Sequence, residues 1–465
     1  MIDSLRPYAD TKPTGLPWLG DVPTHWNVRR IKTLLREVDS RTKTGEERLL
    51  SLRMRQGLVD HIDAGGKLIP PESLVNFKIV EPGQVVMNRM RAAAGLFGVA
   101  NVRGLVSPDY AVFEPMPDAF NPYLLHAFRL PSLSAVFRAE SKGLGTGESG
   151  FLRLYTDRFG PIPVPYPPLD EQRLIVRFLD WHGAQTAKMI RAKKKIIALL
   201  NEQKQGIIHR AVTRGLDPNV RLKSSGVPWV AEIPTHWQML PNRAFLRKRK
   251  LLVGAAHNEF QLLSLTKQGV IVRDVESGKG KFSADMGTSQ VVNVGDIVFC
   301  LFDIPETPRT VGLSRHEGMI TGAYTVFSFS GDVDPNYIEL FYIAMDDRKL
   351  LGPLYTGLRN TIAPSRFVGI KTPIPPMPEQ RSIVEAVQIA TAEMNTTISK
   401  IENEVSLILE YRTRLIADVV TGKLDVRAVA ASLAETFEQE TIDELVEDDE
   451  LDEAVDDAEN EEVAA

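Results

Sequence analysis

The sequence contains little cysteine and no long apolar run. Cys300 is its only cysteine, so no disulfide can form within the chain, and this composition fits a reducing cytosol. A membrane-spanning helix needs about 18 or more apolar residues in succession, and the sequence has no such run. Residues 1–14 are polar and lack the apolar segment of a secretory signal. These absences predict a cytoplasmic protein that is not inserted in a membrane.

Basic residues are absent from the C-terminal segment. Of the 60 Asp and Glu residues, 16 lie between Glu435 and the end, where there is no Lys or Arg. The remainder has 44 acidic residues against 55 Lys and Arg, a net charge of +11. We expect residues 428–465 to form a solvated, disordered acidic tail, with competition against DNA for a basic surface as the alternative. The basic remainder is compatible with a polyanionic partner but does not specify one.

The sequence also lacks the motifs of nucleotide-dependent enzymes. Residues 143–147, Gly-Leu-Gly-Thr-Gly, are similar to a phosphate-binding loop, but no strand pattern precedes them and no Lys-Ser or Lys-Thr follows. We therefore expect a flexible loop there. Residues 121–123 and 334–337 lack the second proline of the Asn/Asp-Pro-Pro-aromatic motif of amino-methyltransferases.

The histidines show no metal-binding spacing. His25 and His236 recur within Pro-Thr-His-Trp, and we expect both to be packing or hydrogen-bonding anchors beside the following tryptophan. Cys300 ends an apolar run and is expected in the core. No catalytic residue, metal site or bound cofactor is predicted, so the chain is predicted not to be an enzyme.

A single internal duplication organises the chain. Residues 16–26 (Leu-Pro-Trp-Leu-Gly-Asp-Val-Pro-Thr-His-Trp) recur at 227–237, a shift of 211. Residues 165–176 match 373–384 at a shift of 208, with Pro-x-Pro-Pro-x-x-Glu-Gln-Arg-x-Ile-Val in both. The gaps fall in the first part of each repeat, while the last part has kept one length. Since packed elements resist insertion more than loops do, the last part is under a length constraint.

The first part of each repeat has the pattern of a mixed α+β domain. Short β-branched runs at 84–87 and 296–299 follow glycine turns and are typical of strands. Short helices are expected near 123–137 and 337–350.

The second part of each repeat predicts one long helix. Prolines precede it, acidic residues occupy its first turn, and Gly215 and Gly422 lie near the two ends. Apolar residues follow a heptad spacing at equivalent positions of both helices, with a basic residue at one matched position, Lys204 and Arg412. The predicted seam contains Ile190, Ile197, Leu200, Ile207, Ile398, Ile401, Val405, Ile408 and Leu415.

Two arrangements of the helices are compatible with this pattern. Each could be buried in its own domain, or the two could pair along the seam, which their equal length and register favour. Antiparallel pairing would place the preceding domains at opposite ends of a rigid spacer, with a pseudo-twofold axis between them. The spacing of two half-sites would then follow from the length of the helices.

The repeated motifs resemble those of the specificity subunits of type I restriction–modification systems. The resemblance rests on the Gly-[Leu/Val]-Pro-Trp opening at 15–26 and 226–237, on the Pro-rich junction at 165–176 and 373–384, and on the Thr-x-x-Leu-Asp ends. It covers nearly the whole chain to about Arg427, but the acidic tail is not part of it.

The resemblance implies a non-catalytic, DNA-binding subunit. Each globular part would be a target-recognition domain that reads one part of a split site in double-stranded DNA. The helices would also dock methyltransferase subunits, two of them, and restriction subunits would join that core. S-adenosylmethionine, ATP and Mg would be bound only by these partner subunits, which would methylate adenine and cleave DNA.

The fold class expected is therefore α+β, with two target-recognition domains, each followed by a long helix, and the helices pairing as an antiparallel coiled coil. The expected division is a polar leader at 1–15, recognition domain 1 at 16–166, spacer helix 1 at 167–217, a linker and recognition domain 2 at 218–374, spacer helix 2 at 375–427, and the tail at 428–465.

DNA contacts are expected from Arg, Lys, Asn and Gln on loops that occupy equivalent places in the two domains. The two domains differ most in these stretches, as two domains that read different half-sites would. The candidates are Arg53, Arg55, Gln56, Arg89, Arg91 and Lys142 in the first domain, and Lys267, Gln268, Arg359 and Asn360 in the second.

Two other functions compete with this prediction. A stand-alone DNA-binding protein or scaffold would have the same repeats but no methylating partner. An independent enzyme would need cofactor or metal motifs, which were not found.

Overall fold

The computed structural model describes residues 5–54, 56–144, 151–273 and 286–433. Its contacts divide the chain into two compact units. Unit 1 comprises residues 1–194 and 403–465, and unit 2 comprises residues 195–402. The α+β class predicted from the sequence is confirmed, since each unit combines a mixed domain with segments of two long helices.

Unit 1 is built around a four-stranded antiparallel sheet in the order β4-β11-β8-β9. Two-stranded pairs surround it, and the helices α1 and α2 are the expected ones near 123–137. The elements are β4 (Leu35–Val38), β11 (Ala111–Pro115), β8 (Val85–Met87) and β9 (Phe97–Val99), with the pairs β1 (Thr11–Pro13) and β2 (Asp21–Pro23), β3 (Asn27–Arg30) and β14 (Pro163–Tyr166), β5 (Leu50–Arg53) and β6 (Gly57–Asp60), β7 (Lys78–Val80) and β10 (Gly104–Val106), β12 (Lys142–Leu144) and β13 (Phe151–Arg153), and the helices α1 (Asn121–Phe128), α2 (Pro131–Glu140), α3 (Thr156–Phe159) and α8 (Arg427–Ala431).

Unit 2 repeats this topology. Its four-stranded sheet has the order β18-β25-β22-β23, and each of its two-stranded pairs has a counterpart in unit 1. The unit 1 pair β12-β13 has no counterpart among the described residues of unit 2. The elements are β18 (Leu246–Arg249), β25 (Thr325–Phe329), β22 (Ile297–Phe299) and β23 (Val311–Leu313), with the pairs β15 (Leu222–Val227) and β16 (Val230–Pro234), β17 (Gln238–Pro241) and β26 (Lys371–Ile374), β19 (Leu263–Thr266) and β20 (Gly269–Val272), β21 (Gln290–Val292) and β24 (Gly318–Ile320), and the helices α5 (Pro335–Asp347) and α6 (Pro364–Phe367).

The two long helices are confirmed. α4 (Leu169–Arg214) has 46 residues and α7 (Met377–Val420) has 44. Each follows a strand that contains proline. Acidic side chains lie in the first turn of each helix, where the positive end of the helix dipole stabilises them. Gly215 and Gly422, with φ of 72° and 77°, follow the two ends in the left-handed conformation that terminates many helices.

The helix segments within each unit run antiparallel, since residue numbers that rise along α4 meet falling numbers along α7. In unit 1 the His182 ring lies 6.2 Å from that of Tyr411, and Lys193 pairs with Glu404 further on. In unit 2 the Lys204 ammonium donates to Asn395 at 2.8 Å. The positions of the predicted seam are all buried or half-buried, whereas Leu199 and Leu407 beside them are exposed.

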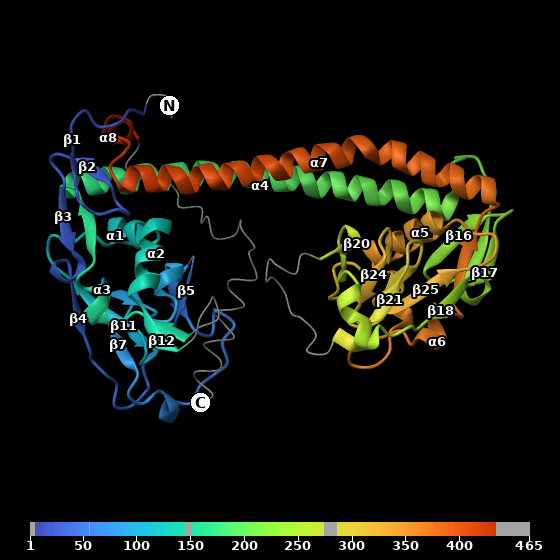
Figure 1. Ribbon diagram of the computed structural model, residues 1–465, viewed down its shortest axis with the longest axis horizontal. Coiled ribbons are helices and arrows are strands. Elements are labelled where there is room, and N and C mark those ends of the chain that lie inside the picture. The colour runs from blue at the N-terminus through green and yellow to red at the C-terminus, as the bar shows by residue number, and fades with distance from the viewer. Residues whose placement is uncertain (1–4, 55, 145–150, 274–285, 434–465) are drawn as a thin grey trace. The chain divides into compact units, whose positions relative to one another are not determined.

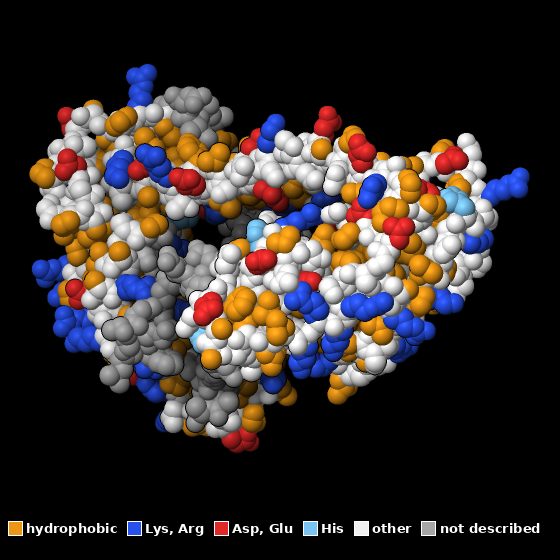
Figure 2. Space-filling view, turned by 45° about the vertical axis from the view of Figure 1, so that its right-hand side comes forward, with side chains coloured by type: hydrophobic (Ala, Val, Ile, Leu, Met, Phe, Trp, Pro, Cys, Tyr) orange, Lys and Arg blue, Asp and Glu red, His pale blue; other side chains and the backbone are white. Residues whose placement is uncertain are grey.

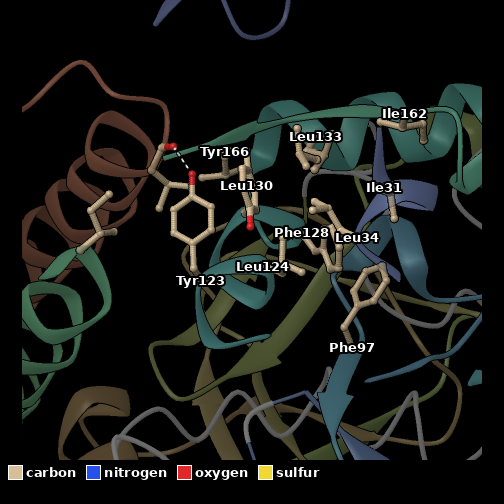
Figure 3. Close-up of a cluster of buried hydrophobic side chains, with 14 of the residues drawn as sticks. Ile31, Leu34, Phe97, Tyr123, Leu124, Phe128, Leu130, Leu133, Ile162 and Tyr166 are labelled. Carbon is tan, nitrogen blue, oxygen red and sulfur yellow. Dashed lines mark hydrogen bonds between the residues drawn. The ribbon is translucent and has the colours of Figure 1, made fainter. Parts of the chain in front are cut away.

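Each domain core includes the end of the helix that belongs to the other repeat. In unit 1 the Tyr123 hydroxyl lies 3.1 Å from the Val420 carbonyl of α7 and 3.2 Å from the Pro165 carbonyl, beside a cluster of buried side chains (Figure 3). In unit 2 the Tyr337 hydroxyl lies 3.4 Å from the Val212 carbonyl of α4 and 2.9 Å from that of Pro373. The same tyrosine therefore joins domain and helix in both units.

The N-terminal segment differs from the expected leader. Thr11–Pro13 pairs with Asp21–Pro23 as β1 and β2, and Tyr8 is buried in the unit 1 core. Arg6 forms a β-bridge with Asp425, whose amide donates to the Arg6 carbonyl at 2.8 Å. The segment is polar by composition, but these contacts build it into the domain.

Candidate nucleic-acid interface

The candidate side chains of the first domain lie around β5, β8 and β12. Arg53 was expected on a loop, but it is the last residue of β5 and only 8% exposed. Its guanidinium donates to the Ala64 carbonyl at 3.0 Å. Because this contact uses a buried guanidinium, Arg53 supports the loop after β6 and is a weaker candidate for a direct contact.

Two first-domain candidates are exposed. Gln56 lies in the turn between β5 and β6, and Lys142 is the first residue of β12. Arg55, the third member of this group, lies outside the described residues. The exposed amide and ammonium groups are of the kind that contacts base edges or phosphates.

Arg89 and Arg91 follow β8, as predicted. The Arg89 guanidinium donates to Glu37 at 2.9 Å and lies over the Tyr155 ring, 6.0 Å from its centroid. Arg91 is half-buried before a short 3₁₀ helix. These contacts fix the direction of Arg89 in the folded domain.

In the second domain Lys267 and Gln268 form the exposed turn between β19 and β20. They line a hollow of about 420 Å³ within unit 2, together with Lys204 of α4 and two arginines, Arg309 and Arg315. Burial lowers the pKa of the Lys204 ammonium. Acidic side chains share the hollow: Arg309 pairs with Asp347 at 2.8 Å, so its positive charge is partly neutralised.

Arg359 and Asn360 lie in a second turn of the same domain. The Arg359 guanidinium pairs with Asp303 and stacks over the Phe302 ring, 4.9 Å from its centroid. The hydrogen bond from Arg359 holds the pKa of the Asp303 carboxyl below its usual range. Asn360 has a φ of 42°, a left-handed conformation that asparagine tolerates better than most residues. In the described part of the chain, no hydrogen bond or ion pair joins this turn to the 267–268 turn.

A carboxylate at the start of each long helix binds the Pro-Thr-His-Trp motif. Glu171 accepts from His25 Nε2 at 2.8 Å and from Trp26 Nε1 at 3.0 Å, and Glu379 accepts from His236 at 2.8 Å and Trp237 at 3.1 Å. The expectation that these histidines are hydrogen-bonding anchors is confirmed. The glutamates were not predicted as partners, although their recurrence beside the repeated motif was a usable signal.

Unit 1 extends this junction with residues from both ends of the chain. The Tyr8 hydroxyl donates to Glu171 Oε1 at 2.6 Å, and the Arg427 guanidinium lies 5.1 Å above the Tyr8 ring centroid. Burial and the adjacent Glu171 raise the pKa of Tyr8 well above its usual value. The expected core position of Cys300 is also confirmed, at 2% exposure.

Neither a metal cluster nor a membrane span is found in the part of the chain that the structure describes. No group of three or more His, Cys, Asp or Glu side chains there could hold a metal ion. No helix there is long and apolar enough to cross a membrane.

Comparison with known proteins agrees with the repeated architecture. The family model for the type I restriction modification DNA specificity domain matches residues 72–199. A putative type I restriction enzyme MjaX specificity subunit from Methanocaldococcus jannaschii is 20% identical over 430 residues, which cover 88% of this chain and 96% of that protein. The chain is therefore similar to type I restriction–modification specificity subunits, in the matched domain and along most of its length.

Two further similarities extend the comparison, one in sequence and one in fold alone. The MjaVIII specificity subunit of the same organism is 23% identical over 328 residues, 66% of this chain and 70% of that protein. The fold is similar to that of a chain in a structure solved to explain complex assembly and conformational transition of the type I R-M system. The two align with a TM-score of 0.59 at 12% identity, over 86% of this chain and 98% of that one.

Proposed function

We propose that this chain is a type I restriction–modification specificity subunit that reads a bipartite, interrupted DNA target, with one half-site bound by the recognition domain of each unit. The observation that carries the proposal is the duplication of topology without duplication of the loops. The two domains share the four-stranded sheet and four of the surrounding strand pairs, while the candidate loops differ in sequence: Arg53 to Gln56 at the end of β5, and Lys267 with Gln268 after β19. A common scaffold with different side chains suits two readers of different base sequences.

The long helices form the spacer in this proposal, paired as an antiparallel coiled coil with pseudo-twofold symmetry. The antiparallel contacts inside each unit and the burial of the seam positions support it. At about 1.5 Å per residue, the 46 residues of α4 extend roughly 70 Å, which makes the half-site spacing a property of helix length.

The partners follow from the same proposal. Two copies of a methyltransferase subunit dock on the helices, one related to each repeat, and restriction subunits join that core. S-adenosylmethionine, ATP and Mg belong to those partners, and this chain supplies target recognition in the cytoplasm. The second part has the same length in both repeats. This equality supports two helices that pair with each other and also dock a partner subunit.

The test is to co-express the chain with the methyltransferase of its own system and to map methylated adenine in the host genome. We expect a two-part motif with a fixed gap, and deletion of either recognition domain should abolish it. A stable complex without methylation, or no complex, would favour a stand-alone DNA-binding protein or scaffold instead.

A further inference from the structure

The internal duplication allows a position-by-position comparison of two surfaces that share one scaffold. Side chains that read bases should differ between domains that bind different half-sites. Side chains that contact the sugar-phosphate backbone face the same chemistry in both halves, since phosphates carry no sequence information. Exposed cations kept at equivalent positions of the two units are therefore candidates for backbone contacts.

Three such positions occur in each domain. Two lie in and just before the edge strand of the four-stranded sheet, β4 or β18, and the third lies in the short helix α3 or α6. All six side chains are exposed. In unit 1 they are Lys32, Arg36 and Arg158, and in unit 2 they are Arg243, Arg247 and Arg366. We call each set the basic triad of its unit.

Backbone contacts keep the members of each triad close together. The Lys32 amide donates to the Gly160 carbonyl at 2.9 Å, two residues after Arg158. The Arg243 amide donates to the Val368 carbonyl at 2.7 Å, again two residues after the triad arginine, Arg366. The third member follows four residues after the first, and in unit 2 the Arg247 guanidinium donates to the Arg243 carbonyl.

The unit 2 triad is not neutralised. Among the described residues, no carboxylate forms an ion pair with Arg243, Arg247 or Arg366, and Ser328 lies opposite Arg247 in the sheet. Three further lysines nearby in the sequence are exposed: Lys248 on β18, Lys250 just after that strand, and Lys371 at the start of β26. Figure 2 shows Lys and Arg side chains gathered on the face of this unit that is turned to the viewer.

The unit 1 triad has the same layout with more acid around it. Arg158 pairs with Glu140 at 3.6 Å, and Glu114 lies opposite Arg36 in the ladder between β11 and β4. Its net positive charge is therefore smaller. The base-reading candidate Arg359 contrasts with the unit 2 triad, because its charge is paired with Asp303.

We propose that the two basic triads contact DNA phosphates without reading sequence and so position each recognition domain on the duplex. This inference rests on the proposed function, because it takes DNA as the partner. An acidic protein surface is the other polyanion that such a patch could fit. DNA is favoured because the triads belong to the same domains as the candidate loops. In unit 1, Arg36 lies on β4, in the four-stranded sheet that also contains β8, the strand before Arg89 and Arg91.

The experiment uses the preassembled complex of the full chain with its methyltransferase, and duplexes with and without the mapped target. Arg243, Arg247 and Arg366 are changed together to Gln, and affinity is measured from about 50 to 200 mM salt. Each lost phosphate contact reduces the slope of log K against log salt by about 0.9, so a reduction of up to about 2.7 is expected. The loss should be the same on both duplexes, and the methylated motif should be unchanged.

Two matched variants define the controls. Changing Arg221, Arg348 and Lys400 to Gln removes the same charge from exposed positions of unit 2 outside the triad, and should leave the slope within a few tenths of the original. Changing the triad arginines to Lys keeps the charge and should preserve the slope. The corresponding unit 1 triple, K32Q with R36Q and R158Q, should reduce the slope less. If the unit 2 triple fails to fold, R366Q alone should still reduce the slope by about 0.9.

Several outcomes would overturn the inference. A slope like that of the control triple would show that the triad does not touch phosphates. A loss confined to the target duplex, or an altered methylated motif, would make these side chains base readers. Normal DNA binding with loss of the methyltransferase from the complex would assign the patch to an acidic protein. Failure of the proposed function has a different signature, since the unchanged complex would then show no preference between the duplexes.

Discussion

The carboxylate of Glu171 accepts the indole N–H of Trp26 at 3.0 Å, deep in the junction between the N-terminal hairpin and α4. The side chain of Glu171 is only 6% exposed, whereas that of Glu379, its equivalent in the second repeat, is 27% exposed. Glu171 also accepts from Tyr8, for which the second repeat has Asn219. The same motif thus carries a larger buried network in unit 1.

Removing the two glutamates should therefore destabilise the chain unequally. We expect Glu171→Ala to cost about 3 kcal/mol, because Tyr8 and Trp26 would keep buried donors without an acceptor, and Glu379→Ala to cost about 1 kcal/mol. Urea unfolding followed by tryptophan fluorescence measures both. Glu171→Gln keeps one acceptor oxygen and should lose less than the alanine variant, and equal losses for the two alanine variants would contradict the network.

The helix seam predicts a sharp difference between adjacent residues. Ile408 lies at a half-buried seam position, whereas its neighbour Leu407 is 63% exposed. Ile408→Asp places a charge where an apolar side chain packs and should cost about 2–4 kcal/mol, while Leu407→Asp should change stability by less than about 0.5 kcal/mol. Thermal unfolding of the two variants makes the comparison. Equal midpoints would argue against pairing along this seam.

A buried histidine of α4, His182, and a half-buried one, His209, predict a dependence of stability on pH. Burial lowers the pKa of His182, aided by Arg412, and burial also lowers that of His209, aided by Arg348 and Arg214. The folded chain therefore binds these protons less readily than the unfolded chain. Stability should be independent of both groups above about pH 7 and should fall as the pH drops below about 6.5, the usual pKa of histidine.

The decrease should approach about 1.4 kcal/mol per pH unit for each histidine until the pH reaches its folded-state pKa. Urea midpoints at pH 7.5 and pH 5.5 measure it. His182→Gln should reduce the difference between the two pH values, while the same change at the exposed His316 serves as the control and should not. A difference unaffected by His182→Gln would exclude this histidine as a cause.

The paired tyrosines of the two cores predict matched losses. Tyr123 and Tyr337 each place a fully buried hydroxyl near the last turn of the helix from the other repeat. Replacing either by Phe removes one neutral hydrogen bond and leaves a carbonyl with other partners, so about 1 kcal/mol is expected in both cases. Calorimetric midpoints of the two single variants give the comparison, and a loss in only one unit would contradict their equivalence.

The sequence predicted the larger elements well because their signals are periodic or repeated. The long helices follow from heptad spacing, prolines and terminal glycines, and the recurring His-Trp anchors follow from duplication. The individual site residues are harder to predict. Arg53 had the composition of a loop contact, yet the strand β5 continues to it and buries it. Whether a cation is free depends on carboxylates distant in sequence, as with Arg359 and Asp303, which are 56 residues apart.

The domain boundaries and the DNA contacts stay predictions. Packing produced one arrangement that no local pattern indicates: each compact unit takes the first half of one helix and the second half of the other. The basic triads were also missed, since each member alone is an ordinary surface charge. Only comparison of the two halves, once the sheets fix which positions correspond, separates them from other surface lysines and arginines.

The bridge between Arg6 and Asp425 gives the chain a cyclic character. Asp217, in the middle of the sequence, corresponds to both residues. It ends the first repeat as Asp425 ends the second, and it lies before the second repeat where Arg6 lies before the first. At one of these two equivalent places the backbone is continuous, and at the other the Asp425 amide donates a hydrogen bond to the Arg6 carbonyl. Covalent joining of Asp425 to Pro7, with new ends opened after Asp217, should keep both domains with the halves in reverse order, at the loss of α8, whose Ala430 is buried in the unit 1 core. Which half is translated first is then a matter of gene structure and leaves the fold unchanged.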